Sequence, residues 1–248
     1  MKQTTSILIV FLSVLSFKGS AQLTVEDYTN YRLAGFNVLV QNKALTTHTE
    51  TTYVAIELLE AKLIEISQFN INPIKIDSLR AVPIFMDWDT TSGAAQYHPS
   101  KSWLVANDYL PEKAKCIEIS NIPNFINWTN QNQPYMVLHE LAHAYQHRVL
   151  DNNSTIINNA YKNAVSNNLY TNILYHKGDG EQFTKESAYA LTNEKEYFAE
   201  LTEAYFGVND YFPFNGKDLM KYDTIGFKAV VAVWGDITTG KHLQKKKQ

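Results

Sequence analysis

Two histidines and one glutamate stand together as His139-Glu140-Leu141-Ala142-His143, the pattern H-E-x-x-H. In a helix, residues i and i+4 lie on one face, so the two imidazoles are close enough to hold one metal ion. The carboxylate of Glu140 lies beside them, where it can accept a proton from a metal-activated water. This combination is typical of zinc-dependent peptidases and indicates hydrolysis of a peptide bond.

The residues around the motif predict a helix buried in the centre of a domain. Pro134 suits a first helical turn. Most other positions are apolar, which is expected for a helix without a solvent-facing side: Met136, Val137, Leu138, Leu141, Ala142, Tyr145 and Val149. A short motif also occurs by chance, so the alternative is a buried helix whose histidines only satisfy hydrogen bonds.

Zinc needs a third protein ligand, and spacing excludes two nearby candidates. His147 lies eight residues after His139, about 12 Å further along a helix, which is too far for one ion. Gln146 and Val149 stand where the metzincin pattern requires Gly and His. We therefore expect the third ligand elsewhere in the chain.

An acidic segment downstream offers such a ligand. Residues 194–206 read as a helix, because Thr192 or Asn193 suits the N-cap and Gly207 suits the C-terminal end. A carboxylate on this second helix would complete a site of two His and one Glu.

Three glutamates of this segment, Glu196, Glu200 and Glu203, share one helical face. A second carboxylate one turn beyond the ligand would accept the free ring N–H of a ligand histidine, and we expect Glu200 in that role. Two alternatives stay open on spacing alone. The face is an ordinary solvated one, or Glu196 caps the helix start from Asn193.

The segment Tyr189–Glu200 (YALTNEKEYFAE) resembles the region that follows H-E-x-x-H in the gluzincin metallopeptidases of the anthrax lethal factor and Pro-Pro endopeptidase family. The resemblance also covers Gln133–His147, and a weaker likeness to uncharacterised secreted metallopeptidase-like proteins spans about residues 80–235. It implies a gluzincin fold, Glu196 as the third zinc ligand, and a catalytic Tyr189 that points into the site and stabilises the oxyanion. It says little about the substrate.

The N-terminus predicts export. Lys2 gives a short basic start, residues 6–17 form an apolar run too short to span a bilayer, and Gly19 and Ala21 suit cleavage before Gln22. We therefore expect a signal peptide at residues 1–21 and a secreted or periplasmic zincin-like catalytic domain at residues 22–248. No other long apolar segment predicts a membrane span in the mature chain.

Net charge and cysteine content limit the classes of partner and cross-link that this chain can have. The net charge of −3 argues against binding driven by nucleic-acid phosphates. The H-E-x-x-H motif instead indicates a peptide or protein substrate. The chain contains one cysteine, Cys116, which predicts a small buried side chain and no intrachain disulfide.

The order of the elements, strands first and helices later, suits an α+β domain. Together with the resemblance it implies a zincin-like fold, in which a mixed sheet covers the active-site helix and a second helix bears a ligand. The expected strands are 36–40, 82–86, 94–97 and 114–119, and the further helices are 48–68, 155–165 and 224–234. Residues 168–175 fit a strand or a helix, and 100–112 give no clear prediction. By the resemblance, 94–98 form an edge strand for substrate, and we expect His98 at the surface.

The sequence therefore predicts a secreted metallopeptidase that uses Zn²⁺. The first alternative is a non-catalytic zinc-binding or protein-binding module of the same fold, although Glu140 has no purpose in a purely structural zinc site. The second alternative is an amidase that acts on cell-wall peptides.

Overall fold

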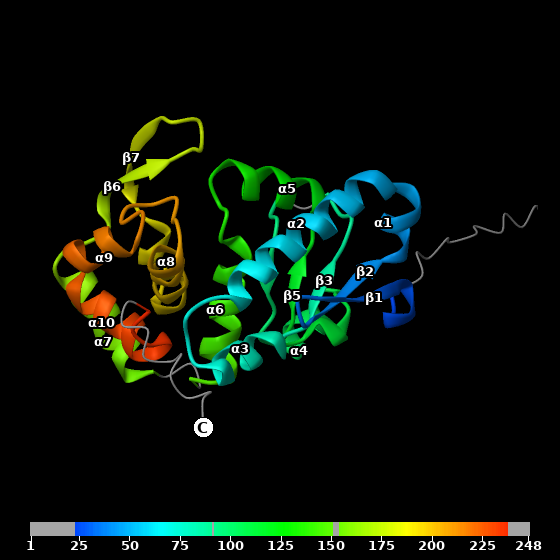
Figure 1. The fold of residues 1–248 in the computed structure, drawn as a ribbon, viewed down its shortest axis with the longest axis horizontal. Helices are drawn as coiled ribbons and strands as arrows, with labels where there is room; N and C mark the ends of the chain where they lie inside the picture. Colours follow the sequence, from blue (N-terminus) through cyan, green and yellow to red (C-terminus); the bar gives the residue numbers. More distant parts are fainter. Residues whose placement is uncertain (1–22, 91, 151–153, 238–248) are drawn as a thin grey trace, which may run out of the picture.

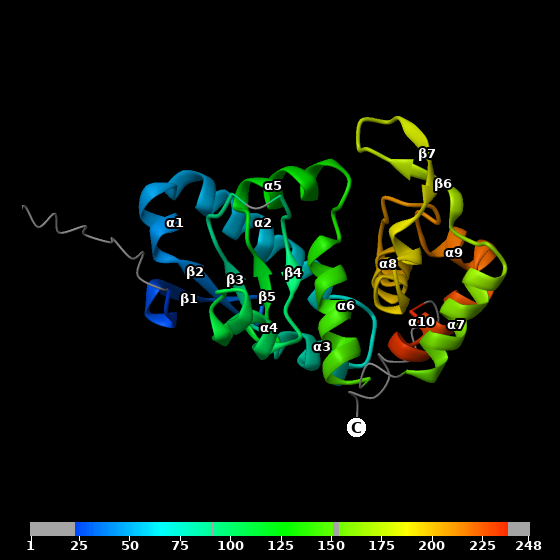
Figure 2. The same cartoon turned by 180° about the vertical axis from the view of Figure 1, so that it is seen from behind.

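The computed structural model describes residues 23–90, 92–150 and 154–237, and the signal peptide predicted at residues 1–21 lies outside these ranges. Helix α6 (Met136–Arg148), which carries H-E-x-x-H, runs through the middle of the molecule. A sheet and its helices lie on one side of α6, and a group of helices with a β-hairpin lies on the other (Figures 1 and 2).

The sheet is mixed and has the order β1-β2-β3-β5-β4. Its strands are β1 (Tyr28–Leu33), β2 (Phe36–Gln41), β3 (Ile84–Met86), β5 (Ile117–Ile119) and β4 (Gln96–Tyr97). The three central strands are parallel, whereas β1 and β4 are each antiparallel to their neighbour. The mixed sheet of an α+β fold is thus confirmed, and β4 forms one edge.

A two-residue turn joins β1 to β2 and sets their register. Ala34 and Gly35 have φ values of 47° and 91°, and Leu33 pairs with Phe36. Positive φ at both central residues matches the twist of the strands, which is why such turns favour glycine. A Cβ on Gly35 would also lie 2.9 Å from Nε of Arg80.

Helices cover one face of the sheet. α1 (Asn42–Thr47), α2 (Thr49–Ser67), α3 (Pro73–Arg80) and α5 (Ile122–Gln131) surround the main core. Leu59 and Leu63 of α2 are fully buried in that core, as is Ile84 of β3. The helix predicted at 48–68 agrees with α2.

The other face of the sheet carries a smaller core, made of Tyr28, Phe85, Leu110 and Cys116. It lies near α4 (Lys101–Ala106) and the short 3₁₀ helix η2 (Pro111–Lys113), which occupy the region without a clear sequence prediction. Cys116 is buried as expected.

The C-terminal helices pack on α6 through aromatic side chains. They are α7 (Thr155–Ser166), α8 (Glu194–Phe206), α9 (Gly216–Tyr222) and α10 (Thr224–Trp234), so the helices predicted at 155–165, 194–206 and 224–234 are confirmed. Trp234 is fully buried, with its ring 4.4 Å from that of Tyr145 and 5.9 Å from that of Phe198 (centroid distances). Its indole N–H donates to Oγ1 of Thr202.

The ambiguous segment 168–175 belongs to a hairpin of β6 (Thr171–His176) and β7 (Gln182–Ser187), which projects from the C-terminal part (Figure 1). Its turn contacts the end of α5, because a Cβ on Gly178 would lie 1.9 Å from the carbonyl oxygen of Gln131. Two short 3₁₀ helices, η1 (Val25–Asp27) and η3 (Tyr189–Leu191), complete the described elements. Within the described residues, no helix combines the length and apolar character needed to cross a bilayer.

Candidate metal centre

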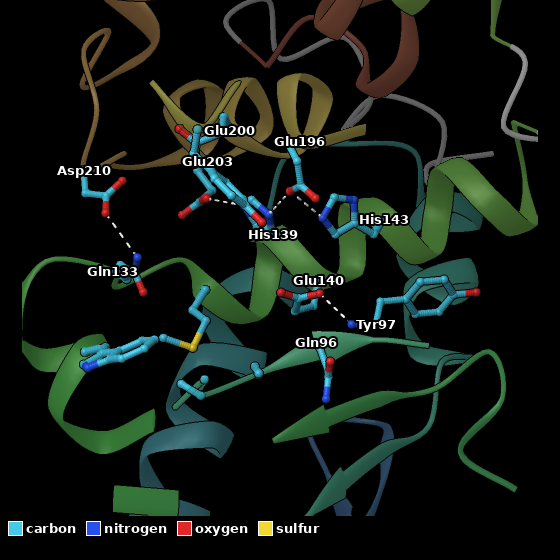
Figure 3. Close-up of a pocket in the computed structure, with 16 residues that line it drawn as sticks. Gln96, Tyr97, Gln133, His139, Glu140, His143, Glu196, Glu200, Glu203 and Asp210 are labelled. Carbon is cyan, nitrogen blue, oxygen red and sulfur yellow. Dashed lines mark hydrogen bonds and ion pairs between the residues drawn. The ribbon is translucent and has the colours of Figure 1, made fainter. Parts of the chain in front are cut away.

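The two histidines of α6 and Glu196 of α8 converge on one point (Figure 3). The ring centroids of His139 and His143 are 4.7 Å apart. The Nε2 atom of each lies 3.0 Å from the same carboxylate oxygen of Glu196. The structure therefore brings together the three residues that were predicted to bind zinc.

The three donor atoms fit a zinc ion. Two imidazole nitrogens and one carboxylate oxygen, with a position left for water, are the ligands of a catalytic zinc site. Ligand atoms about 2.1 Å from a tetrahedral ion are roughly 3.4 Å apart, so a small outward movement from the observed 3.0 Å suffices.

The N-cap of α8 frees Glu196 for this position. The side chain of Asn193 accepts hydrogen bonds from the backbone N–H groups of Lys195 and Glu196. Asn193 thereby satisfies the donors that a helix N-terminus leaves unpaired. The carboxylate of Glu196 faces the histidines, rather than capping the helix.

The carboxylate that holds His139 is Glu203, which corrects the expectation for Glu200. Oε1 of Glu203 lies 2.6 Å from Nδ1 of His139, whereas Glu200 accepts a hydrogen bond from the side-chain amide of Asn209. Glu203 follows Glu196 by seven residues, about 20° short of two helical turns, whereas four residues overshoot one turn by about 40°. The i+7 spacing is the sequence signal that would have favoured Glu203 over Glu200.

The centre favours positive charge. Burial alone would lower the pKa of His139, but hydrogen bonds to Glu196 and Glu203 raise it well above its ordinary value. Burial would raise the pKa of Glu196, but hydrogen bonds from His139 and His143 hold it below its usual range. These carboxylates thus stabilise a cation at the imidazoles, as metal binding requires.

Two further acids lie along the same cavity. Burial and then the charge of Glu203 raise the pKa of Glu200 well above its ordinary value, and the same two causes raise the pKa of Asp210 to about 7. Asp210 accepts a hydrogen bond from the side-chain amide of Gln133 at 3.1 Å, which joins the start of α6 to the loop after α8. No sequence signal pointed to the contact between Asp210 and Gln133.

Glu140 and Tyr189 both line the cavity, which has a volume of about 410 Å³. Glu140 is buried and accepts a hydrogen bond of 2.7 Å from the backbone N–H of Tyr97 in β4. Tyr189 is 48% exposed, and its ring centroid lies 6.2 Å from that of His139. Tyr189 therefore borders the metal centre and is not a core residue.

His98 is buried, which corrects the expectation of a surface side chain. Its Nε2 lies 2.6 Å from Oε2 of Glu118. The other oxygen of Glu118 forms an ion pair with Lys113, which also pairs with Asp87. Asp87, His98, Lys113 and Glu118 thus form one buried charged cluster next to β4 and β5.

The geometry thus places the predicted metal ligands, the expected base and the tyrosine around one cavity. No protein-family model, curated protein or solved structure matches this chain.

Proposed function

We propose that this protein is an exported zinc metallopeptidase of the zincin type, with His139, His143 and Glu196 as zinc ligands. One observation carries the proposal. Two imidazole nitrogens lie 3.0 Å from one carboxylate oxygen, in the same cavity as Glu140. The N-terminal sequence supports export.

A bound zinc ion would supply a Lewis acid that activates water and polarises the scissile carbonyl. The residues of the chain perform the other steps. Glu203 fixes the ring of His139, so that its Nε2 faces the cavity. Glu140 accepts the proton of the attacking water and passes it to the leaving amine. The hydroxyl of Tyr189 donates a hydrogen bond to the oxyanion.

The edge strand supports a peptide as the substrate. β4 is the last strand of the sheet, and residues 93–97 line the cavity together with the histidines. An extended peptide adds to such an edge through main-chain hydrogen bonds, at positions other than the N–H of Tyr97, which donates to Glu140. The scissile bond would then lie along the cavity.

A library of quenched peptides, tested beside peptidoglycan fragments, decides among the candidate functions. We expect the zinc-loaded wild type to cleave peptides, and Glu140→Gln to lose cleavage at equal zinc content, since an amide cannot serve as the base. Cleavage only of peptidoglycan fragments would identify an amidase. Zinc in both proteins with cleavage by neither would favour a binding module.

A further inference from the structure

The edge strand β4 holds the side chain of the expected base. The backbone N–H of Tyr97 donates to Oε2 of Glu140 at 2.7 Å (Figure 3). In an antiparallel pair, successive residues direct their backbone groups alternately toward the partner strand and away from it. The backbone N–H of His98 donates to the carbonyl of Cys116, just before β5. The backbone N–H of Tyr97 therefore points away from β5, toward α6. We infer that this N–H is a positioning group for Glu140.

This contact fixes one of the two carboxylate oxygens. A flexible Glu side chain samples several rotamers, and holding one of them lowers the entropy cost of reaching the reactive arrangement. A hydrogen bond from a backbone amide to a carboxylate is charge-assisted, and a strand provides a rigid donor. The other oxygen of Glu140 stays free to accept the proton of a water in the cavity.

Two side-chain anchors hold β4 in place for this purpose. On one side, the hydroxyl of Tyr97 lies 2.8 Å from Nδ1 of His147, which follows Glu140 by two turns of α6. On the other side, Oε2 of Glu118 accepts a hydrogen bond from the side chain of Gln96 and contacts His98. Gln96 accordingly points away from Glu140 (Figure 3). A strand of only two residues is thus fixed from both faces.

The buried cluster makes the second anchor rigid. Glu118 and Lys113 are both almost completely buried and form an ion pair, and Asp87 binds the same ammonium group. Breaking a buried ion pair leaves a charge with neither a partner nor water, which costs free energy. Paired buried charges therefore keep one defined arrangement. The cluster therefore fixes Gln96 and His98, which flank Tyr97.

A matched pair of variants isolates the N–H of Tyr97. Tyr97→Pro and Tyr97→Ala both lack the phenol, but only proline lacks the N–H, and proline is tolerated at outward-facing edge positions. The inference rests on the proposed peptidase activity. We expect kcat of Tyr97→Pro to fall roughly ten- to a hundredfold below that of Tyr97→Ala, with equal KM and zinc content.

A backbone ester at position 97 provides the same comparison if the proline variant fails to fold. The α-hydroxy analogue of tyrosine, inserted by nonsense suppression, replaces the N–H with oxygen and keeps the phenol. We expect the same fall in kcat relative to wild type. An unchanged kcat, or a higher KM at constant kcat, would overturn the inference, since the second result assigns the N–H to substrate binding.

Nuclear magnetic resonance tests the contact without any turnover. In protein labelled with ¹⁵N-tyrosine, we expect the amide proton of Tyr97 to move upfield in Glu140→Ala, while the amide of Tyr161, which lies on α7, stays in place. An unmoved Tyr97 amide would contradict the inference whether or not the protein is active. Absence of hydrolysis by the wild type would instead overturn the proposed function, and the amide shift would still show whether the contact between Tyr97 and Glu140 exists.

Discussion

The partner of His139 decides how firmly that imidazole is held. A ligand histidine is oriented by the hydrogen bond of its other nitrogen, and its loss typically lowers metal affinity ten- to a hundredfold. Since Glu203 lies 2.6 Å from Nδ1, we expect Glu203→Gln to show such a loss and Glu200→Gln a smaller one. Zinc affinity measured by chelator competition checks this. A larger effect of Glu200→Gln would restore the original expectation for that residue.

A substitution of Tyr189 tests whether its half-exposed phenol takes part in the reaction. Its pKa is raised, first by burial and then by the charge of Glu196, so the hydroxyl keeps its proton and remains a donor at neutral pH. Removal of one donor to an oxyanion costs about a hundredfold or more in kcat. We expect that loss in Tyr189→Phe with zinc content unchanged. A kcat equal to that of the wild type would exclude the role.

Gln146 is a polar residue whose burial costs stability. It is fully buried on α6, and within the described residues neither atom of its amide has a hydrogen-bond partner. Methionine has a similar shape without these groups, so we expect Gln146→Met to raise the free energy of unfolding by about 1–3 kcal/mol. Urea denaturation measures this, with the exposed Gln182→Met as the control. A lower stability for Gln146→Met would show that the amide is satisfied.

The elements that carry clear end signals could be predicted from the sequence. The cap at Asn193 and the stop at Gly207 delimit α8, and the apolar spacing of α2 and α10 delimits those helices. The β6–β7 hairpin lacks such a signal, because β7 is exposed on both faces and shows no alternation. β4 has only two residues, which is too short for a pattern.

The meeting of His139 with His143 could be predicted, because spacing within one helix fixes their shared face, whereas the choice of Glu196 came from the resemblance of its segment. The contacts around them depend on how separate elements meet, which a sequence alone does not give. Asp210 reaches Gln133 across 77 residues, and Tyr97 reaches Glu140 across 43. His98 likewise finds Glu118 only because β4 and β5 pair.

The charged cluster behind β4 and β5 makes stability depend on pH. Burial would raise the pKa of Glu118, but the hydrogen bond from His98 and the charge of Lys113 lower it to about 2 from an ordinary value of 4.5. A carboxyl group with a lowered pKa stabilises the fold above its unfolded-state pKa, and this contribution is lost as the pH falls through the folded-state pKa. The relevant window is therefore between about pH 4.5 and pH 2.

We expect Glu118→Gln to be less stable than the wild type at pH 6, because it leaves part of the charge of Lys113 unpaired. The difference between the two proteins should shrink from pH 4.5 toward pH 2, as the wild type loses its carboxylate. Unfolding by urea across this range checks the expectation, and the exposed Glu112→Gln is the control. A stability difference between Glu118→Gln and the wild type that stays constant with pH would show that ionisation of Glu118 is not its cause.

At the scale of the whole molecule, the candidate metal centre lies between its two parts. His139 and His143 come from the central helix, whereas Glu196 comes from α8 in the C-terminal group (Figure 1). A ligand that binds only the folded state stabilises it by RT ln(1 + [L]/Kd), which is about 4 kcal/mol when the ligand concentration is a thousand times Kd. Bound zinc should therefore resist separation of α6 from α8, and so stabilise the whole domain.

We expect zinc at that excess to raise Tm by roughly 10 °C for a domain of this size, and a chelator to reverse the change. Glu140→Gln should keep the increase, because Glu140 does not bind the metal, whereas His143→Ala should lose most of it. Differential scanning calorimetry measures both variants beside the wild type. An equal increase in His143→Ala would place the stabilising zinc at another site. Loss of the increase in Glu140→Gln would instead make Glu140 a ligand, and exclude it as the base.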